Sequence, residues 1–143
     1  IFATWYVLGD SIDKVKMLNE LNNTGLTDVR LFIAATIYWI FINSILEEYV
    51  FRWFITMRSI DLTGSENIGI LLSAFLFTLH HSLALHLLGF EWWQTVMASF
   101  GLVTAAAVWS WLYVRYNSII VCWISHAICD IAVFGIAYQI IFT

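Results

Sequence analysis

Two adjacent carboxylates, Glu47 and Glu48, and the guanidinium of Arg52 lie inside an otherwise apolar segment, residues 31–57. A charged side chain at the centre of a bilayer costs at least about 2.5–3.5 kcal/mol, so such groups mark function by default. Glu48 and Arg52 are four residues apart, so on a helix they share a face and are expected to form an ion pair. Glu47 is rotated by roughly 100° from Glu48. It is therefore free to point toward a different partner.

Candidate partners for Glu47 occur in two other apolar segments. One carries His80 and His81, with Phe77 four residues before His81, and the other carries His126 and Asp130, also four residues apart. A carboxylate at that spacing can set the tautomer of an imidazole and raise its basicity. Carboxylates and imidazoles are the usual general acids and bases of enzymes. We expect these residues to form one buried catalytic site.

The composition is that of a membrane protein. Hydrophobic residues make up 62% of the 143 residues and charged residues only 11%, against about 25% charged in soluble domains. There is no basic run with interleaved aromatic residues, so nucleic acid is not an expected partner. Cys122 and Cys129 match no metal or redox spacing and are expected to be buried apolar residues.

The long apolar runs predict an all-α fold, a polytopic transmembrane helical bundle. Each run can cross a hydrocarbon core of about 30 Å, whereas an open sheet would leave backbone groups unpaired in lipid. We predict four complete spans after the end of an upstream helix at residues 1–9. The spans are residues 29–58, 68–88, 92–114 and 118–142.

The polar segments complete this outline. Residues 10–28 are predicted to be a loop with a short interfacial helix at 11–21, and residues 59–67 a turn-rich connection. By the positive-inside rule, the loop that carries Lys14 and Lys16 is expected in the cytoplasm. The chain starts at Ile1 in an apolar run, without a methionine. We therefore predict a single domain, residues 1–143, that lacks its N-terminal part.

The depths of the polar groups predict that they meet. At 1.5 Å per residue, Glu47 lies roughly 16 Å along its helix from Arg58, and His81 roughly 21 Å from Asn67. His126 lies roughly 14 Å from Asn117 on the same scale. If the helices alternate in direction, these three reference residues are on one membrane face, so the three groups converge near mid-bilayer.

Three motifs in this order resemble those of the CPBP family of intramembrane proteases, which includes CAAX prenyl endopeptidases and bacteriocin-processing proteins. They cover residues 45–130, and the span at 92–114 contributes no signature. The motifs are Glu-Glu-x-x-x-Arg at Glu47, Glu48 and Arg52, Phe-x-x-x-His at Phe77 and His81, and His-x-x-x-Asp at His126 and Asp130.

The resemblance implies peptide-bond hydrolysis in the membrane by a glutamate-activated water. It implies that Glu47 is the general base, that His81 helps to position and deprotonate the water, and that Glu48 and Arg52 are an ordering ion pair. His126 and Asp130 match the pair that stabilises the oxyanion. Because an ionised aspartate cannot donate a hydrogen bond, we expect His126 to be the donor and Asp130 to orient it.

The same resemblance implies a peptide or protein substrate inside the lipid bilayer. Prenylated CAAX tails, bacteriocin leaders and C-terminal sorting tags all remain open as substrates. It also implies a multi-pass protein of a bacterial or archaeal cell membrane. His80 faces away from His81, and either supports the site from behind or only packs.

Metal-free catalysis without a cofactor is favoured, because no HExxH or comparable tight zinc motif is present. The alternative is a zinc site formed by Glu47, His81 and His126. Two alternatives of other classes also remain: a bis-histidine haem protein, which leaves Glu47 without a role, and a proton-coupled carrier or inactive scaffold of the same fold.

Overall fold

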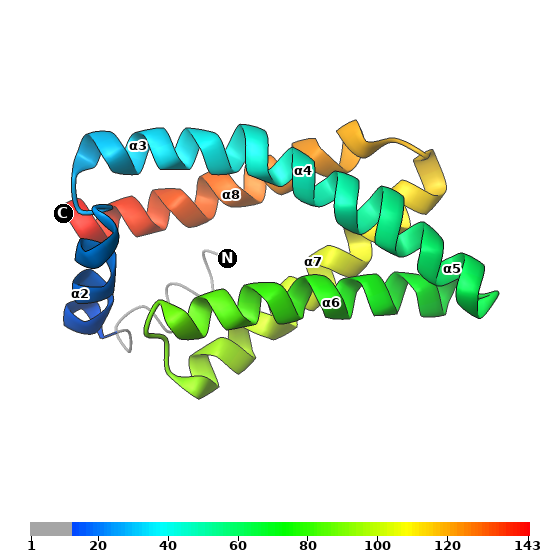
Figure 1. Cartoon of the computed structure of the whole chain (residues 1–143), viewed down its shortest axis with the longest axis horizontal. Coiled ribbons are helices and arrows are strands. Elements are labelled where there is room, and N and C mark those ends of the chain that lie inside the picture. The colour runs from blue at the N-terminus through cyan, green and yellow to red at the C-terminus, as the bar shows by residue number, and fades with distance from the viewer. Residues whose placement is uncertain (1–12) are drawn as a thin grey trace.

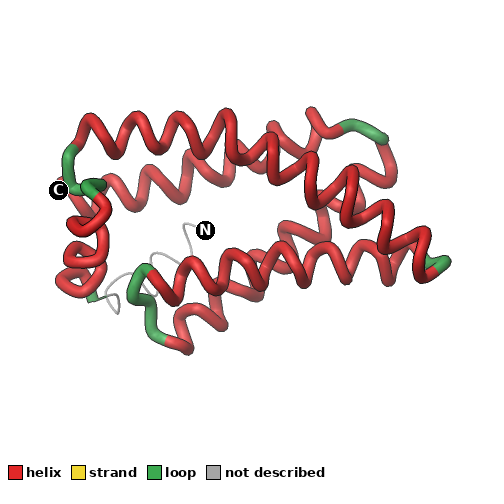
Figure 2. The backbone as a smooth tube through the Cα atoms, viewed as in Figure 1, coloured by secondary structure: helices red, strands yellow, loops and turns green. Residues whose placement is uncertain are grey.

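The computed structural model of the protein describes residues 13–143, in which all regular structure is helical and no strand occurs (Figures 1 and 2). The predicted all-α fold is confirmed. Four of its helical rods are long and apolar enough to cross a membrane, also as predicted. The predicted end of an upstream helix, residues 1–9, lies outside the described residues.

The first span is one continuous helical rod from Val29 to Thr63. At 1.5 Å per residue it is about 50 Å long, more than the thickness of a bilayer core. Two of its five segments have the wider turns of a π-helix. In order they are α3 (Val29–Tyr38), η2 (Trp39–Asn43, π), α4 (Ser44–Glu48), η3 (Tyr49–Thr56, π) and α5 (Met57–Thr63).

The predicted connection at residues 59–67 is wrong, because helix α5 continues through most of it. An ion pair between Arg58 Nη1 and Asp61 Oδ2 (2.9 Å) and a hydrogen bond from Thr63 Oγ1 to the Ser59 carbonyl (2.7 Å) support this last turn. Gly64 then ends the helix with φ 68°, a left-handed conformation that glycine adopts at no steric cost. The true connection is only Gly64 and Ser65.

Backbone carbonyls of the π segments accept hydrogen bonds from side chains, including side chains of other helices. The Phe51 carbonyl in η3 accepts hydrogen bonds from Thr56 Oγ1 and from Ser73 Oγ, each at 2.8 Å. The Ile40 carbonyl in η2 accepts one from Trp123 Nε1 at 3.3 Å. Buried backbone groups need such partners. The two π segments thereby attach the first span to the second and fourth spans.

The remaining spans are helices α6 (Glu66–Leu87), α7 (Trp92–Tyr116) and α8 (Ile119–Phe142). Their bounds agree with the prediction to within two residues. The short helix expected at 11–21 is α2 (Lys14–Thr24), which begins after Asp13, whose carboxylate accepts from the Lys16 amide. It ends at Gly25, which is left-handed with φ 78°.

Helices α3 and α8 pack side by side, as do α6 and α7, and the two pairs diverge toward one end of the molecule (Figure 1). Where the pairs approach each other, a small apolar core joins α6, α7 and α8. It consists of Ala74, Phe77, Ala106, Trp109, Tyr113 and Cys122.

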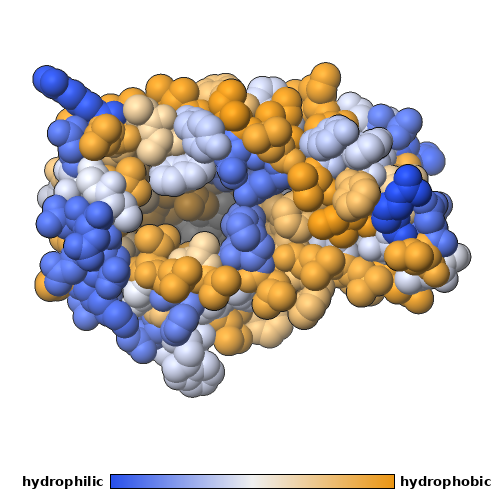
Figure 3. Space-filling model, viewed as in Figure 1, coloured by the Kyte–Doolittle hydropathy of each residue, from blue (hydrophilic) through white to orange (hydrophobic). Residues whose placement is uncertain are grey.

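The distribution of polarity is inverted relative to a soluble protein. Leucine, isoleucine and phenylalanine side chains cover much of the outside, whereas Glu48, Arg52, Ser73 and Ser110 are fully buried. Figure 3 shows this apolar surface, which is hollowed between α8 and α6, with hydrophilic side chains beside the hollow. Burial of polar groups inside an apolar shell is the pattern expected of helices that face lipid.

Candidate active site

Glu48 and Arg52 form a buried ion pair at the centre of the bundle. Arg52 donates from Nε to Glu48 Oε2 at 2.8 Å and from Nη2 to Glu48 Oε1 at 3.2 Å, and neither side chain is exposed. Arg52 Nη1 also donates to Ser110 Oγ at 3.3 Å. The guanidinium lies 4.8 Å from the Phe77 ring centroid and 5.5 Å from that of Trp109. Aromatic faces stabilise such a cation.

The same glutamate also holds His126. Its Oε1 lies 2.8 Å from His126 Nδ1. Because the pair with Arg52 keeps Glu48 ionised, this oxygen accepts, and Nδ1 therefore carries a hydrogen. The sequence interpretation assigned the orienting role to Asp130. In the structure Asp130 Oδ1 is 3.6 Å from Nε2, too far for a hydrogen bond, whereas Glu48 is hydrogen-bonded to the other ring nitrogen.

Glu47 points away from this pair, toward the histidines. Its Oε1 accepts a hydrogen bond from Asn43 Nδ2 at 2.8 Å. Its Oε2 lies 3.8 Å from His81 Nε2 and 3.8 Å from His126 Nε2. The side chain is 13% exposed, whereas that of Glu48 is not exposed at all. The structure thus brings together the three groups whose depths in the sequence suggested convergence.

His81 is held in one orientation by the backbone of its own helix. Its Nδ1 lies 3.0 Å from the Phe77 carbonyl, and its ring stacks on the Phe77 ring at 4.2 Å between centroids. A carbonyl only accepts, so Nδ1 donates and the lone pair of the neutral ring is on Nε2. That lone pair faces Glu47. Phe77 therefore supports His81 both through its backbone and through its ring.

His126 is enclosed on the side opposite Glu47. Its ring stacks on Trp109 with centroids 4.4 Å apart and an interplanar angle of 21°. The edge of the Phe77 ring approaches it at 5.8 Å. The side chain is 5% exposed. Among the described residues, the carboxylate nearest to Nδ1 is that of Glu48, and those of Glu47 and Asp130 lie near Nε2.

His80 lies closer to the site than its position on the helix suggests. Its ring meets that of His81 edge to face at 4.9 Å. Among the described residues, Glu47, His80 and His81 form a group whose ligand atoms all lie within 4.8 Å of one another. The predicted zinc ligands were Glu47, His81 and His126. In the structure His80 takes the place of His126 in such a group.

Three residues near the site were missed by the sequence interpretation. Asn43 is four residues before Glu47, so helical spacing alone was a usable signal. Trp109 and Ser110 belong to α7, the span that carries no motif. Tryptophan and serine are common in apolar helices, and only packing reveals that these two contact His126 and Arg52.

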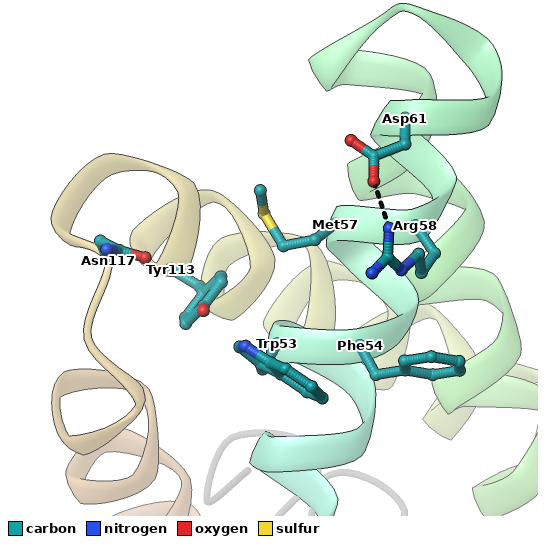
Figure 4. A pocket seen from close by; sticks show the side chains of 7 residues that line it. All are labelled: Trp53, Phe54, Met57, Arg58, Asp61, Tyr113 and Asn117. Carbon is teal, nitrogen blue, oxygen red and sulfur yellow. Dashed lines mark hydrogen bonds and ion pairs between the residues drawn. The ribbon is translucent and has the colours of Figure 1, made fainter.

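A separate cavity of about 290 Å³ lies near the far end of the first span. Figure 4 shows it between the start of α5 and the end of α7, with the pair Arg58–Asp61 on one side. Arg58 is eleven residues beyond Glu47, roughly 16 Å along the helix. The side chains that line the cavity include none of the predicted catalytic residues. They are Trp53, Phe54, Met57, Arg58, Asp61, Tyr113 and Asn117.

The Glu47 carboxylate and the lone pair of His81 Nε2 face the same space. The second imidazole, that of His126, is fixed by its hydrogen bond to Glu48.

The model of one protein family, described as type II CAAX prenyl endopeptidase Rce1-like, matches residues 29–132. The match covers most of the chain and includes all three motifs. No curated protein and no solved structure matches the chain.

Proposed function

The chain belongs to the type II CAAX prenyl endopeptidase Rce1-like family, and on that premise we propose that it hydrolyses a peptide bond in the C-terminal tail of a prenylated substrate. The four long apolar helices support a site for this reaction within the membrane. The proposal includes a bacterial or archaeal cell membrane as the location.

The observation that carries the proposal is the position of Glu47 between two imidazoles. One water, hydrogen-bonded at about 2.8 Å to each acceptor, bridges Glu47 Oε2 and His81 Nε2, which are 3.8 Å apart. Both atoms accept, so each receives one of the two hydrogens of that water. The carboxylate then takes a proton as the water oxygen attacks the scissile carbonyl carbon.

His126 is the proposed donor to the oxyanion that this attack creates. Glu48 accepts from Nδ1, so a hydrogen is available on Nε2 only when the ring is an imidazolium. The proposed donor is therefore the ring with a hydrogen on both nitrogens, and its face stacks on Trp109. A preorganised donor of this kind stabilises the transition state.

The proton then returns to complete the reaction. As the carbon–nitrogen bond breaks, protonated Glu47 gives its proton to the leaving nitrogen, and the products are a carboxylic acid and an amine. The carboxylate is regenerated and binds the next water. Each step uses groups that lie within a few ångströms of Glu47 Oε2.

The alternatives from the sequence have less support. A bis-histidine haem needs the space between the two imidazoles for iron, yet Glu47 Oε2 lies 3.8 Å from both Nε2 atoms. A proton-coupled carrier or an inactive scaffold finds no support in the family match.

The test is cleavage of an internally quenched prenylated CAAX peptide by purified protein in detergent. We expect Glu47→Gln, which keeps the size of the side chain, to lower the turnover by about 100- to 10,000-fold, the usual contribution of a general base. Its thermal unfolding should match that of the wild type. Wild-type turnover in Glu47→Gln would refute the proposal.

Two controls sharpen this test. Glu66→Gln removes an exposed carboxylate in the first turn of α6, far from the site in the sequence, and is expected to cleave normally. A strong chelator is added to each sample, and the proposal expects activity to survive it. Loss of activity with the chelator would instead make a metal part of the reaction.

A further inference from the structure

Three potential metal ligands converge from two helices beside the proposed water site. Adjacent residues on a helix diverge by roughly 100°, yet the rings of His80 and His81 meet edge to face with centroids 4.9 Å apart. Glu47, at the end of α4, faces the space between them. All three ligand atoms lie within 4.8 Å of one another. The arrangement therefore has a centre that an ion can share.

Two residues of this group, His81 and Glu47, each have one ligand atom that no hydrogen bond occupies. His81 donates through Nδ1 to the Phe77 carbonyl, which leaves Nε2 to coordinate. Metal-binding histidines almost always have this support, a hydrogen bond from the second ring nitrogen to a carbonyl or carboxylate. Glu47 Oε1 is occupied by Asn43, so Oε2 is the free oxygen.

The two imidazoles and one carboxylate, and the exposure of the histidines, are suited to a zinc-class ion. Two imidazoles and one carboxylate with an open fourth position bind Zn²⁺ in known sites, at about 2.0–2.2 Å from each ligand atom. Tetrahedral ligands at that distance are about 3.3 Å apart, so the group has to contract. His80 is exposed and His81 is 27% exposed, so an ion reaches the group without crossing the buried ion pair.

We propose that Glu47, His80 and His81 bind a zinc-class divalent transition-metal ion, and that the bound ion inhibits the enzyme. The inhibition rests on the proposed function, because the ion takes the lone pairs of Glu47 and His81 that would hold the water. The metal site itself is inferred from the positions of these three side chains and does not depend on the proposed function. His80 distinguishes metal binding from water activation, because the proposed water activation uses only Glu47 and His81.

The test is titration of tag-free, chelator-treated protein with ZnCl₂ by calorimetry. We expect one ion per chain for the wild type, and binding weakened at least roughly tenfold in His80→Ala, because even indirect partners of a metal contribute 10- to 100-fold. Glu47→Gln should weaken binding as well, which places the site between two helices. The matched control is His86→Ala, an exposed histidine later in α6, which should bind as the wild type does.

Peptide cleavage in the presence of ZnCl₂ gives the second measurement, with each variant normalised to its own zinc-free rate. The half-inhibiting concentration should rise at least roughly tenfold in His80→Ala and stay unchanged in His86→Ala. No binding by the wild type, or equal binding by His80→Ala, would overturn the site, and stimulation by zinc would overturn the inhibition. If no variant cleaves the peptide, the proposed function fails while calorimetry still decides the site.

Discussion

Glu47 and Glu48 are neighbours in the sequence with the same side chain, yet they belong to two different regions. The buried region contains Glu48, Arg52 and His126, and Glu48 has hydrogen bonds at both of its oxygens. The open region contains Glu47, His81 and His80. There Glu47 has one hydrogen bond, from Asn43, and its second oxygen faces nitrogens that are too far away to bond.

The difference matches the two roles proposed for these residues, Glu48 as a structural partner and Glu47 as the general base. A buried charge is tolerated only when it is paired and hydrogen-bonded, and Glu48 meets that condition completely. Both oxygens of Glu48 are already hydrogen-bonded and its side chain is not exposed, so it is closed to a substrate or a water. Glu47 keeps one oxygen unbonded at a partly exposed position, which is what a general base needs. The two regions meet at His126, which Glu48 holds at Nδ1 and which presents Nε2 to Glu47.

The largest effect on stability is expected from Arg52→Met, which leaves Glu48 buried without its counter-charge. Removal of one partner of a buried pair costs about 3–5 kcal/mol. Arg58→Met is the matched control on the same rod, because its ion pair with Asp61 is exposed and such pairs contribute about 0–1 kcal/mol. Thermal unfolding in one detergent measures both. Equal shifts for the two variants would contradict the comparison.

A smaller loss is expected from Ser110→Ala in the buried region. Ser110 Oγ accepts from Arg52 Nη1 and lies 3.2 Å from Thr56 Oγ1, and a buried donor left without its partner costs about 1–3 kcal/mol. Thr104→Ala, in the same helix, removes an exposed hydroxyl that donates to the Phe100 carbonyl one turn earlier. It should leave the unfolding temperature unchanged. If both variants unfold alike, the hydroxyl of Ser110 is not part of the buried network.

The smallest effect is expected from Asn43→Ala in the open region. It removes the one hydrogen bond to Glu47, a contribution of about 0.5–1.5 kcal/mol, or roughly 2- to 13-fold if it is expressed in the rate. We expect kcat to fall within that range while KM and the unfolding temperature stay the same. A change in stability without a change in kcat would assign Asn43 to the support of the fold instead.

The membrane-spanning fold was readable from the sequence because lipid requires long apolar runs, and α6, α7 and α8 follow those runs within two residues. The end of the first span could not be read from the sequence in this way. Residues 59–63 are polar enough to suggest a connection, but Arg58, Asp61 and Thr63 bond within the helix and prolong it. The π segments carry no residue pattern that distinguishes them from an ordinary helix, and only the structure shows that their carbonyls accept from Ser73 and Trp123.

What the sequence determined by itself was the chemistry available and its approximate depth. Charged and imidazole groups inside apolar runs are expensive, so their types and spacing already indicated Glu47, His81 and His126 as one site. The tertiary structure decided which partners each carboxylate has. Helix α8 brings His126 onto Glu48 and not onto Asp130, and the approach of α6 to α4 places His80 beside Glu47. Those choices depend on how helices rotate and pack against one another, which distances along a single helix do not specify.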